Sequence, residues 1–238
     1  MPSTTHQCTG CQCNGGNCTF NVTTGKCQCQ CQDYVFGHQC SLGQNETTVN
    51  IDTGSIPTRK ASFSLKIDTD YLAEFEDLES SQSQDLIKKL EKQLEVLCKQ
   101  AEPQAYKTVK VTKLSSGSVV ADSEVEYTYP NDENKIQFLN TQLEEVLTEI
   151  LTNTSNINMI SEAFGYKTVE LKNVSVPKPQ IENITGLEPY LNCSGFANYT
   201  AEIANGQWQC VGPCKTNPDY CYQKGECQND IYKGPVCR

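Results

Sequence analysis

The chain's 238 residues have room for one ordinary domain with a core and for one or two small modules. Its formal net charge of −10, without any stripe of lysine or arginine, argues against a nucleic-acid-binding surface. The sequence has no apolar run of about 18 residues, so it predicts no membrane span, and Met1–Thr5 lacks the apolar stretch of a signal peptide.

The 15 cysteines are concentrated at the two ends of the chain. Eight lie in Cys8–Cys40 and six in Cys193–Cys237, with only Cys98 between these groups. This distribution predicts three modules. Dense cysteines indicate either disulfides outside the cytosol or metal sites inside it. Only His6 and His38 could serve as imidazole ligands, which weakens the metal interpretation. We expect no metal site and no cofactor.

Glycosylation sequons favour the disulfide interpretation. Composition alone would produce about three Asn-x-Ser/Thr sequons, and the sequence has more than twice that number. The sequons begin at Asn17, Asn21, Asn45, Asn153, Asn173, Asn183, Asn192 and Asn198. We therefore expect a secreted, glycosylated chain. Because it has no signal peptide, we expect it to be a fragment of a longer protein.

The first module, residues 1–44, contains "CNGGNC", "CQCQC" and "QDYVFGHQC". Gly15 and Gly16 suit a tight turn, and Gly37 suits a second one. This pattern resembles an EGF-like module. Eight cysteines allow about a hundred connectivities, so the pairing rests on the resemblance. The implied bridges are Cys8–Cys18, Cys13–Cys29 and Cys31–Cys40, with Cys11–Cys27 as a fourth.

After a linker at 45–58, residues 59–178 alternate between strand and helix patterns. "ASFSLKI" alternates as a half-buried strand does, and "SQDLIKKLEKQLEVLCKQ" repeats leucines at helical spacing. Two further strands lie on either side of Gly117, a second long helix follows from Asn131 or Asp132, and "GYKTVELKNVSV" is the last strand. The order β-α-β-β-α-β predicts an α+β, ferredoxin-like fold with two helices on one face of an antiparallel sheet.

Gly117-Ser118 stands at the turn between the second and third of these strands, within "GSVVA". Ser-Gly-Ser is a good turn in any hairpin, so one interpretation is an ordinary turn. A β-α-β-β-α-β module with this motif at this turn resembles the SEA domain. Many members of that family cleave themselves between the glycine and the serine. The resemblance therefore implies self-cleavage at Gly117-Ser118, although "LSS" replaces the aromatic, arginine and proline that some members have before the glycine.

The implied chemistry is an N→O acyl shift in which Ser118 Oγ attacks the carbonyl carbon of Gly117, followed by hydrolysis of the ester. A neutral serine normally needs a base. The nearest ionisable residues in sequence, Lys113 and Asp122, lie on polar strand faces. The account that the family suggests uses strain instead, because loss of amide planarity makes the carbonyl easier to attack.

Cys98 is the odd cysteine, and it falls near the apolar face of the first long helix. This position favours a buried free thiol. The alternative is a bridge to a partner outside the chain.

The segment 179–212 predicts a short hairpin, with Asn205-Gly206 as its turn and Cys193–Cys210 as a clip. Residues 213–238 resemble the first four cysteines of a second EGF-like module, truncated at its end. The bridges that this resemblance implies are Cys214–Cys227 and Cys221–Cys237.

EGF-like, SEA and EGF-like modules in this order resemble the membrane-bound intestinal mucins of the mucin-3, mucin-12 and mucin-17 group. The resemblance implies an ectodomain stalk at the apical cell surface, within the glycocalyx. Its partners would be the two cleavage fragments, which stay associated, and the parent transmembrane chain. In this interpretation Pro2–Gln7 is the stub of a glycosylated region.

The alternative function is that of a ligand whose EGF-like modules engage a receptor. No set of nucleophile, base and orienting residue indicates turnover of an external substrate.

Overall fold

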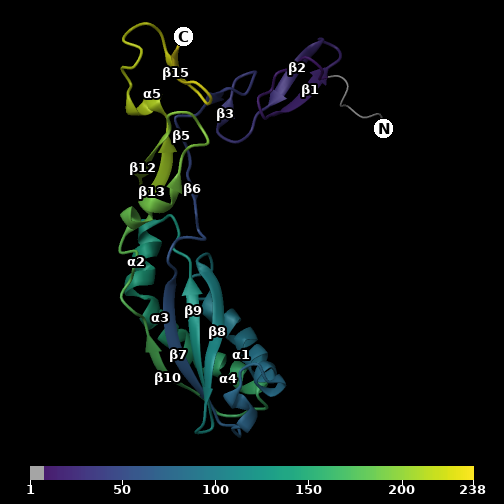
Figure 1. The fold of residues 1–238 in the computed structure, drawn as a ribbon, viewed down its shortest axis with the longest axis vertical. Coiled ribbons are helices and arrows are strands. Elements are labelled where there is room, and N and C mark those ends of the chain that lie inside the picture. The colour runs from purple at the N-terminus through teal and green to yellow at the C-terminus, as the bar shows by residue number, and fades with distance from the viewer. Residues whose placement is uncertain (1–7) are drawn as a thin grey trace. The chain divides into compact units, whose positions relative to one another are not determined.

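The computed structural model describes residues 8–238, which form two compact units (Figure 1). The central unit is Thr53–Pro189. The flank unit combines the described residues up to Asp52 with Tyr190–Arg238, that is, the segments before and after the central unit. The expected stub Pro2–Gln7 lies outside the described residues.

The central unit contains a four-stranded antiparallel sheet in the order β10-β7-β9-β8. Its strands are β7 (Arg59–Ile67), β8 (Tyr106–Ser115), β9 (Val119–Tyr127) and β10 (Val169–Ser175). Buried and half-buried residues alternate along the whole of β9, as expected for a strand with one face on the core. Asp122, Glu124 and Glu126 lie on its open face.

Helices cover the other face of this sheet (Figure 1). They are α1 (Ser81–Lys99), α2 (Glu133–Thr141), α3 (Leu143–Thr152) and α4 (Thr154–Ala163), preceded by the 3₁₀ helix η2 (Ala73–Glu76). Ser80 caps α1, because its side chain accepts a hydrogen bond from the backbone N–H of Ser83. The fully buried leucines of α1 and α3 belong to the core on the helical side: Leu90, Leu94, Leu97, Leu143, Leu147 and Leu151.

The second helical region differs from the single helix that the sequence predicts. It divides at Gln142, where φ reaches −117°, and Asn153 leaves the helical conformation after α3. The Asn153 side chain then accepts hydrogen bonds from the N–H groups of Ser155 and Asn156 and begins α4, a helix that the sequence reasoning did not assign. Asp132, one of the two expected caps, does cap α2.

The register between β10 and β7 shifts between Leu171 and Asn173. This irregularity falls where the apolar pattern of the last strand changes phase. It also falls on an edge of the sheet, where an irregular ladder discourages pairing with another chain.

The flank unit is built from short strands that the disulfides hold together. Its elements are β1 (Asn17–Asn21), β2 (Lys26–Gln30), β3 (Val35–Phe36), β4 (Leu42–Gly43), β5 (Glu46–Thr48), β6 (Asn50–Ile51), β11 (Leu191–Asn192), β12 (Thr200–Ala204), β13 (Gln207–Val211), α5 (Pro213–Thr216), β14 (Cys227–Asp230) and β15 (Gly234–Cys237). The 3₁₀ helix η3 (Ile184–Tyr190) covers the last residues of the central unit and the first residue of the segment that follows it in the chain. Asn205-Gly206, both with positive φ, turn the chain between β12 and β13.

The two segments of the flank unit pair with each other. β4 pairs with β14, β5 with β13, and β6 with β11, all antiparallel. The segment 45–58, expected to be a linker, therefore supplies two strands to ladders with residues that follow the central unit. Strands this short carry too little periodicity to be recognised from the sequence.

Candidate functional site

The Gly117-Ser118 bond lies in a tight turn between the two long strands β8 and β9. β8 ends at Ser115 and β9 begins at Val119, so only three residues connect the strands. Gly117 has a φ of +103°, which a residue with a side chain rarely adopts, and Ser118 has a φ of +59°. A non-glycine residue in this left-handed region is strained by roughly 1–2 kcal/mol. The strain at the expected scissile bond therefore lies at Ser118, whereas glycine adopts the conformation of Gly117 without cost.

A carboxylate that the sequence did not indicate contacts the serine. Ser118 Oγ donates a hydrogen bond of 3.1 Å to Oδ1 of Asp68. Asp68 directly follows β7, and its backbone N–H donates to the carbonyl oxygen of Thr168 at 2.9 Å. Because the last residue of β7, Ile67, pairs with Val119, the register of β7 and β9 brings Asp68 beside Ser118.

The two ionisable residues nearest to the turn in sequence lie elsewhere. The Asp122 carboxylate accepts a hydrogen bond from Ser64 Oγ on β7 at 2.5 Å. Lys113 is exposed and stands opposite Asp122 in the register of β8 and β9. Asp68 is therefore the carboxylate placed to accept the proton of the Ser118 hydroxyl. Ser116 and Gly117 are exposed, so water reaches the bond.

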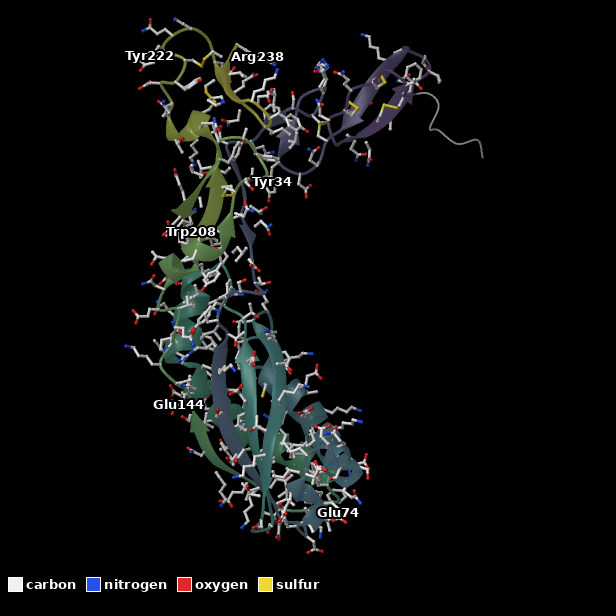
Figure 2. The ribbon with its side chains drawn as sticks, viewed as in Figure 1. Tyr34, Glu74, Glu144, Trp208, Tyr222 and Arg238 are labelled. Carbon is white, nitrogen blue, oxygen red and sulfur yellow. A yellow bond between two sulfur atoms is a disulfide. The ribbon has the colours of Figure 1, made fainter. Side chains whose placement is uncertain are left out.

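The disulfides join the pairs that the sequence reasoning proposed. Within residues 8–238 the bridges are Cys8–Cys18, Cys11–Cys27, Cys13–Cys29, Cys31–Cys40, Cys193–Cys210, Cys214–Cys227 and Cys221–Cys237. Figure 2 shows their sulfur atoms in the flank unit. Each of these bridges lies wholly before Gly117 or wholly after Ser118, so none of them would hold the two sides of a cleaved chain together.

The sulfur atoms of Cys8, Cys11 and Cys18 lie close enough together to suggest a metal site among the described residues. All three are in disulfides, and a bridged sulfur is not a thiolate ligand. His38 is exposed, and His6 lies outside the described residues.

All eight sequon asparagines are exposed. Four of them share a local geometry in which the side-chain oxygen accepts a hydrogen bond from the backbone N–H two residues later. These are Asn21, Asn153, Asn183 and Asn192. The arrangement occupies Oδ1, whereas a glycan is attached through Nδ2. Asn173 lies on the edge strand β10, so that strand can carry a glycan without losing its place in the sheet.

Cys98 is a free thiol, fully buried in α1. Its backbone carbonyl accepts a hydrogen bond from the Tyr127 hydroxyl at 2.7 Å. Burial removes water from the thiolate and raises the pKa of Cys98 to about 12 from an ordinary value of 9.0.

We therefore expect Cys98 to resist alkylation in the folded protein. At pH 8 its thiolate fraction would be about a thousandfold lower than in the unfolded chain, and burial blocks the reagent as well. The measurement is mass-spectrometric counting of iodoacetamide adducts without reductant, with and without denaturant. Rapid labelling of the folded chain would contradict this placement of the thiol.

The comparison with protein families concerns the part of the chain that contains the turn. Residues 60–160 match the SEA domain. The Gly117-Ser118 turn, Asp68 and Cys98 all lie within this SEA domain. No curated protein matches the chain.

SEA domains are not a family of enzymes that turn over external substrates. The SEA domain and the disulfides together indicate an extracellular protein. Among residues 8–238, no helix combines the length and the apolar character that crossing a bilayer requires.

Proposed function

We propose that the chain is the juxtamembrane stalk of a membrane-bound mucin, and that its SEA domain cleaves itself at Gly117-Ser118. The observation that carries the proposal is the strained turn, in which Ser118 Oγ already has a proton acceptor. The assignment of EGF-like flanks is supported by the disulfide pattern. The sheet order β10-β7-β9-β8 supports the ferredoxin-like arrangement.

In the proposed reaction, Ser118 Oγ loses its proton to Asp68 and attacks the carbonyl carbon of Gly117. The Gly117 C–N bond breaks, and the Ser118 nitrogen takes up a proton and becomes a free amine. The resulting ester joins Gly117 to Ser118 Oγ. Water hydrolyses this ester, which leaves a carboxylate on Gly117 and restores the serine hydroxyl.

The magnitudes indicate that strain alone is too small. Shortening the life of a peptide bond from years to hours requires a rate increase of about 10⁴–10⁵, or roughly 6 kcal/mol. The left-handed conformation of Ser118 supplies roughly 1–2 kcal/mol. General base catalysis typically contributes about 10²–10⁴ in rate, so Asp68 can supply much of the difference.

We therefore expect Asp68→Asn to slow self-cleavage by at least about tenfold without unfolding the domain. The asparagine can still accept the hydrogen bond from Ser118 Oγ, but it cannot take up the proton. The measurement is the rate at which the full-length band disappears after refolding, with circular dichroism as the control for folding. An unchanged rate would assign the reaction to backbone geometry alone.

The order of the strands supports association of the two halves after cleavage. β7 and β8 precede Gly117, whereas β9 and β10 follow Ser118. In the order β10-β7-β9-β8, each ladder pairs a strand from one half with a strand from the other. A cut at the turn would break the chain and leave all three ladders in place. The proposed stalk would thus contain a non-covalent joint that force can separate.

A gel with mass spectrometry tests the proposal. The chain is expressed in a secreting host, deglycosylated, reduced and denatured. We expect two fragments, one ending at Gly117 and one starting at Ser118, which co-elute before denaturation. A single intact chain of 26.4 kDa would refute self-cleavage and with it shedding at this bond.

A further inference from the structure

The segments before and after the central unit bind each other through an extended surface in the flank unit. Leu42 and Gly43 pair with Asp230 and Asn229 in the ladder of β4 and β14. The ladder of β5 and β13 follows, centred on Thr47 and Cys210, and then that of β6 and β11. In every case one strand precedes Gly117 and the other follows Ser118.

Two buried side chains, Tyr199 and Asn229, also form hydrogen bonds across this surface. The buried Tyr199 donates a hydrogen bond from its hydroxyl to the carbonyl oxygen of Gln44 at 2.6 Å. Asn229, only 2% exposed, donates through Nδ2 to Oδ1 of Asn45 at 2.9 Å and accepts a hydrogen bond from the backbone of Cys214. These bonds satisfy polar groups that would otherwise be buried unpaired.

Gly43 shows how closely the two segments approach. A Cβ atom at Gly43 would overlap Tyr199 Oη and Ile231 Cγ2, both of which follow the central unit in the chain. Ile231 also donates its backbone N–H to the carbonyl oxygen of Ser41 at 2.9 Å. Backbone and side chains thus form a specific interface between the two segments.

The connectivity determines how tension would reach this interface. The chain leaves the flank unit after Asp52, forms the central unit, and re-enters the flank unit at Tyr190. The central unit is therefore an insertion in the flank unit. Tension between the two ends of the chain therefore passes across the ladders of the flank unit. The central unit experiences tension only after those ladders have separated.

We propose that the flank unit is a second joint between the two cleavage fragments, a clamp that must open before the SEA domain is pulled apart. The inference rests on the proposed function, because it concerns release of one fragment from the other. The partner for residues 8–52 is the segment 190–238 of the same chain. The clamp would shield the cleaved SEA domain from weak or brief tension.

Optical-tweezers measurements on the whole chain, held by its two ends at constant force, test the clamp. The Ser118→Ala chain is used alongside the wild-type chain, so that the test does not depend on self-cleavage. We expect two successive steps in both: opening of the clamp, followed by unfolding of the central unit in the intact chain or fragment separation in a cleaved one. Tyr199→Phe should shorten the lifetime of the first step about fivefold, because one interface hydrogen bond is lost.

Tyr222→Phe is the matched control. Tyr222 is 80% exposed on a loop of the flank unit (Figure 2), and its change should leave both lifetimes unaltered. Gly43→Ala should shorten the first lifetime more than Tyr199→Phe does, because the added methyl group overlaps the partner segment. If Gly43→Ala prevents folding, Tyr199→Phe still decides the question.

A single rupture step, or a first step whose lifetime Tyr199→Phe does not change, would overturn the clamp. Two steps in the Ser118→Ala chain, combined with an uncleaved wild-type chain, would retain the clamp and refute self-cleavage. The failures of the two proposals are therefore distinguishable.

Discussion

Ser118→Ala is expected to leave the chain intact, with the rate of cleavage falling by about 10⁴-fold or more. The alanine keeps the turn but removes the atom that attacks the Gly117 carbonyl carbon in the first step of the proposed reaction. Ser118→Cys should still cleave, because a thiol can make the same shift through a thioester. The measurement is the fraction of intact chain on a reducing gel over days.

Ser116→Ala is the control for this experiment. Ser116 lies in the same exposed turn and has the same hydroxyl, but it is on the far side of Gly117. We expect its replacement to leave cleavage within about threefold of the original rate, since it removes no reacting atom. Cleavage that persists in Ser118→Ala would assign the break to another nucleophile or to a contaminating protease.

Leu94→Ala is expected to destabilise the central unit by about 3 kcal/mol. Leu94 is fully buried in α1, so the change removes apolar contacts and leaves a cavity against the sheet. In the Ser118→Ala background, where the chain stays in one piece, this corresponds to a fall in melting temperature of roughly 10 °C. Differential scanning calorimetry of the whole chain measures it.

Val96→Ala on the same helix is the matched control for Leu94→Ala. Val96 is 51% exposed, and its replacement should change stability by less than about 0.5 kcal/mol. Equal effects of the two substitutions would show that α1 does not pack against the sheet through the leucine face. In the optical-tweezers measurements, Leu94→Ala should shorten the lifetime of the second step and leave that of the first step unchanged.

Strong local periodicity made the central unit predictable. Phe63, Leu65 and Ile67 alternate in β7, and all three are buried. The leucines of α1 recur at helical spacing and form its buried face. The break at Gln142 had no such signal, because apolar residues continue at helical spacing across it. The start of α4 did have a signal, because asparagine is a favourable residue at a helix N-terminus. Asn153 was interpreted only as a glycosylation sequon, and its role as a helix cap was missed.

The candidate site was predictable only in its local part. Gly117 and Ser118 are adjacent, and the strand patterns around them located the turn. Asp68 is distant in sequence, and it reaches Ser118 only because β7 and β9 pair in one particular register. A shift of one residue would send their side chains to opposite faces. Contacts of this kind require the sheet order as well as the strands.

Contacts between segments distant in sequence were even harder to predict in the flank unit. A resemblance to a known module was enough to propose the cysteine pairs. The pairing of β5 with β13 and of β6 with β11 left no trace in composition or periodicity, because these strands have between two and five residues. Their partners lie on the other side of the central unit in the chain.

The order β10-β7-β9-β8 also determines what would remain once the pieces part. Neither piece retains a single native strand pair of this sheet, because β7 and β8 are not neighbours and neither are β9 and β10. Each freed strand would expose unpaired backbone groups, which favour aggregation over reassembly. Separation would therefore be a one-way event. In the proposed stalk, a fragment left at the cell surface would therefore stay without its partner after the tension that separated them had ended.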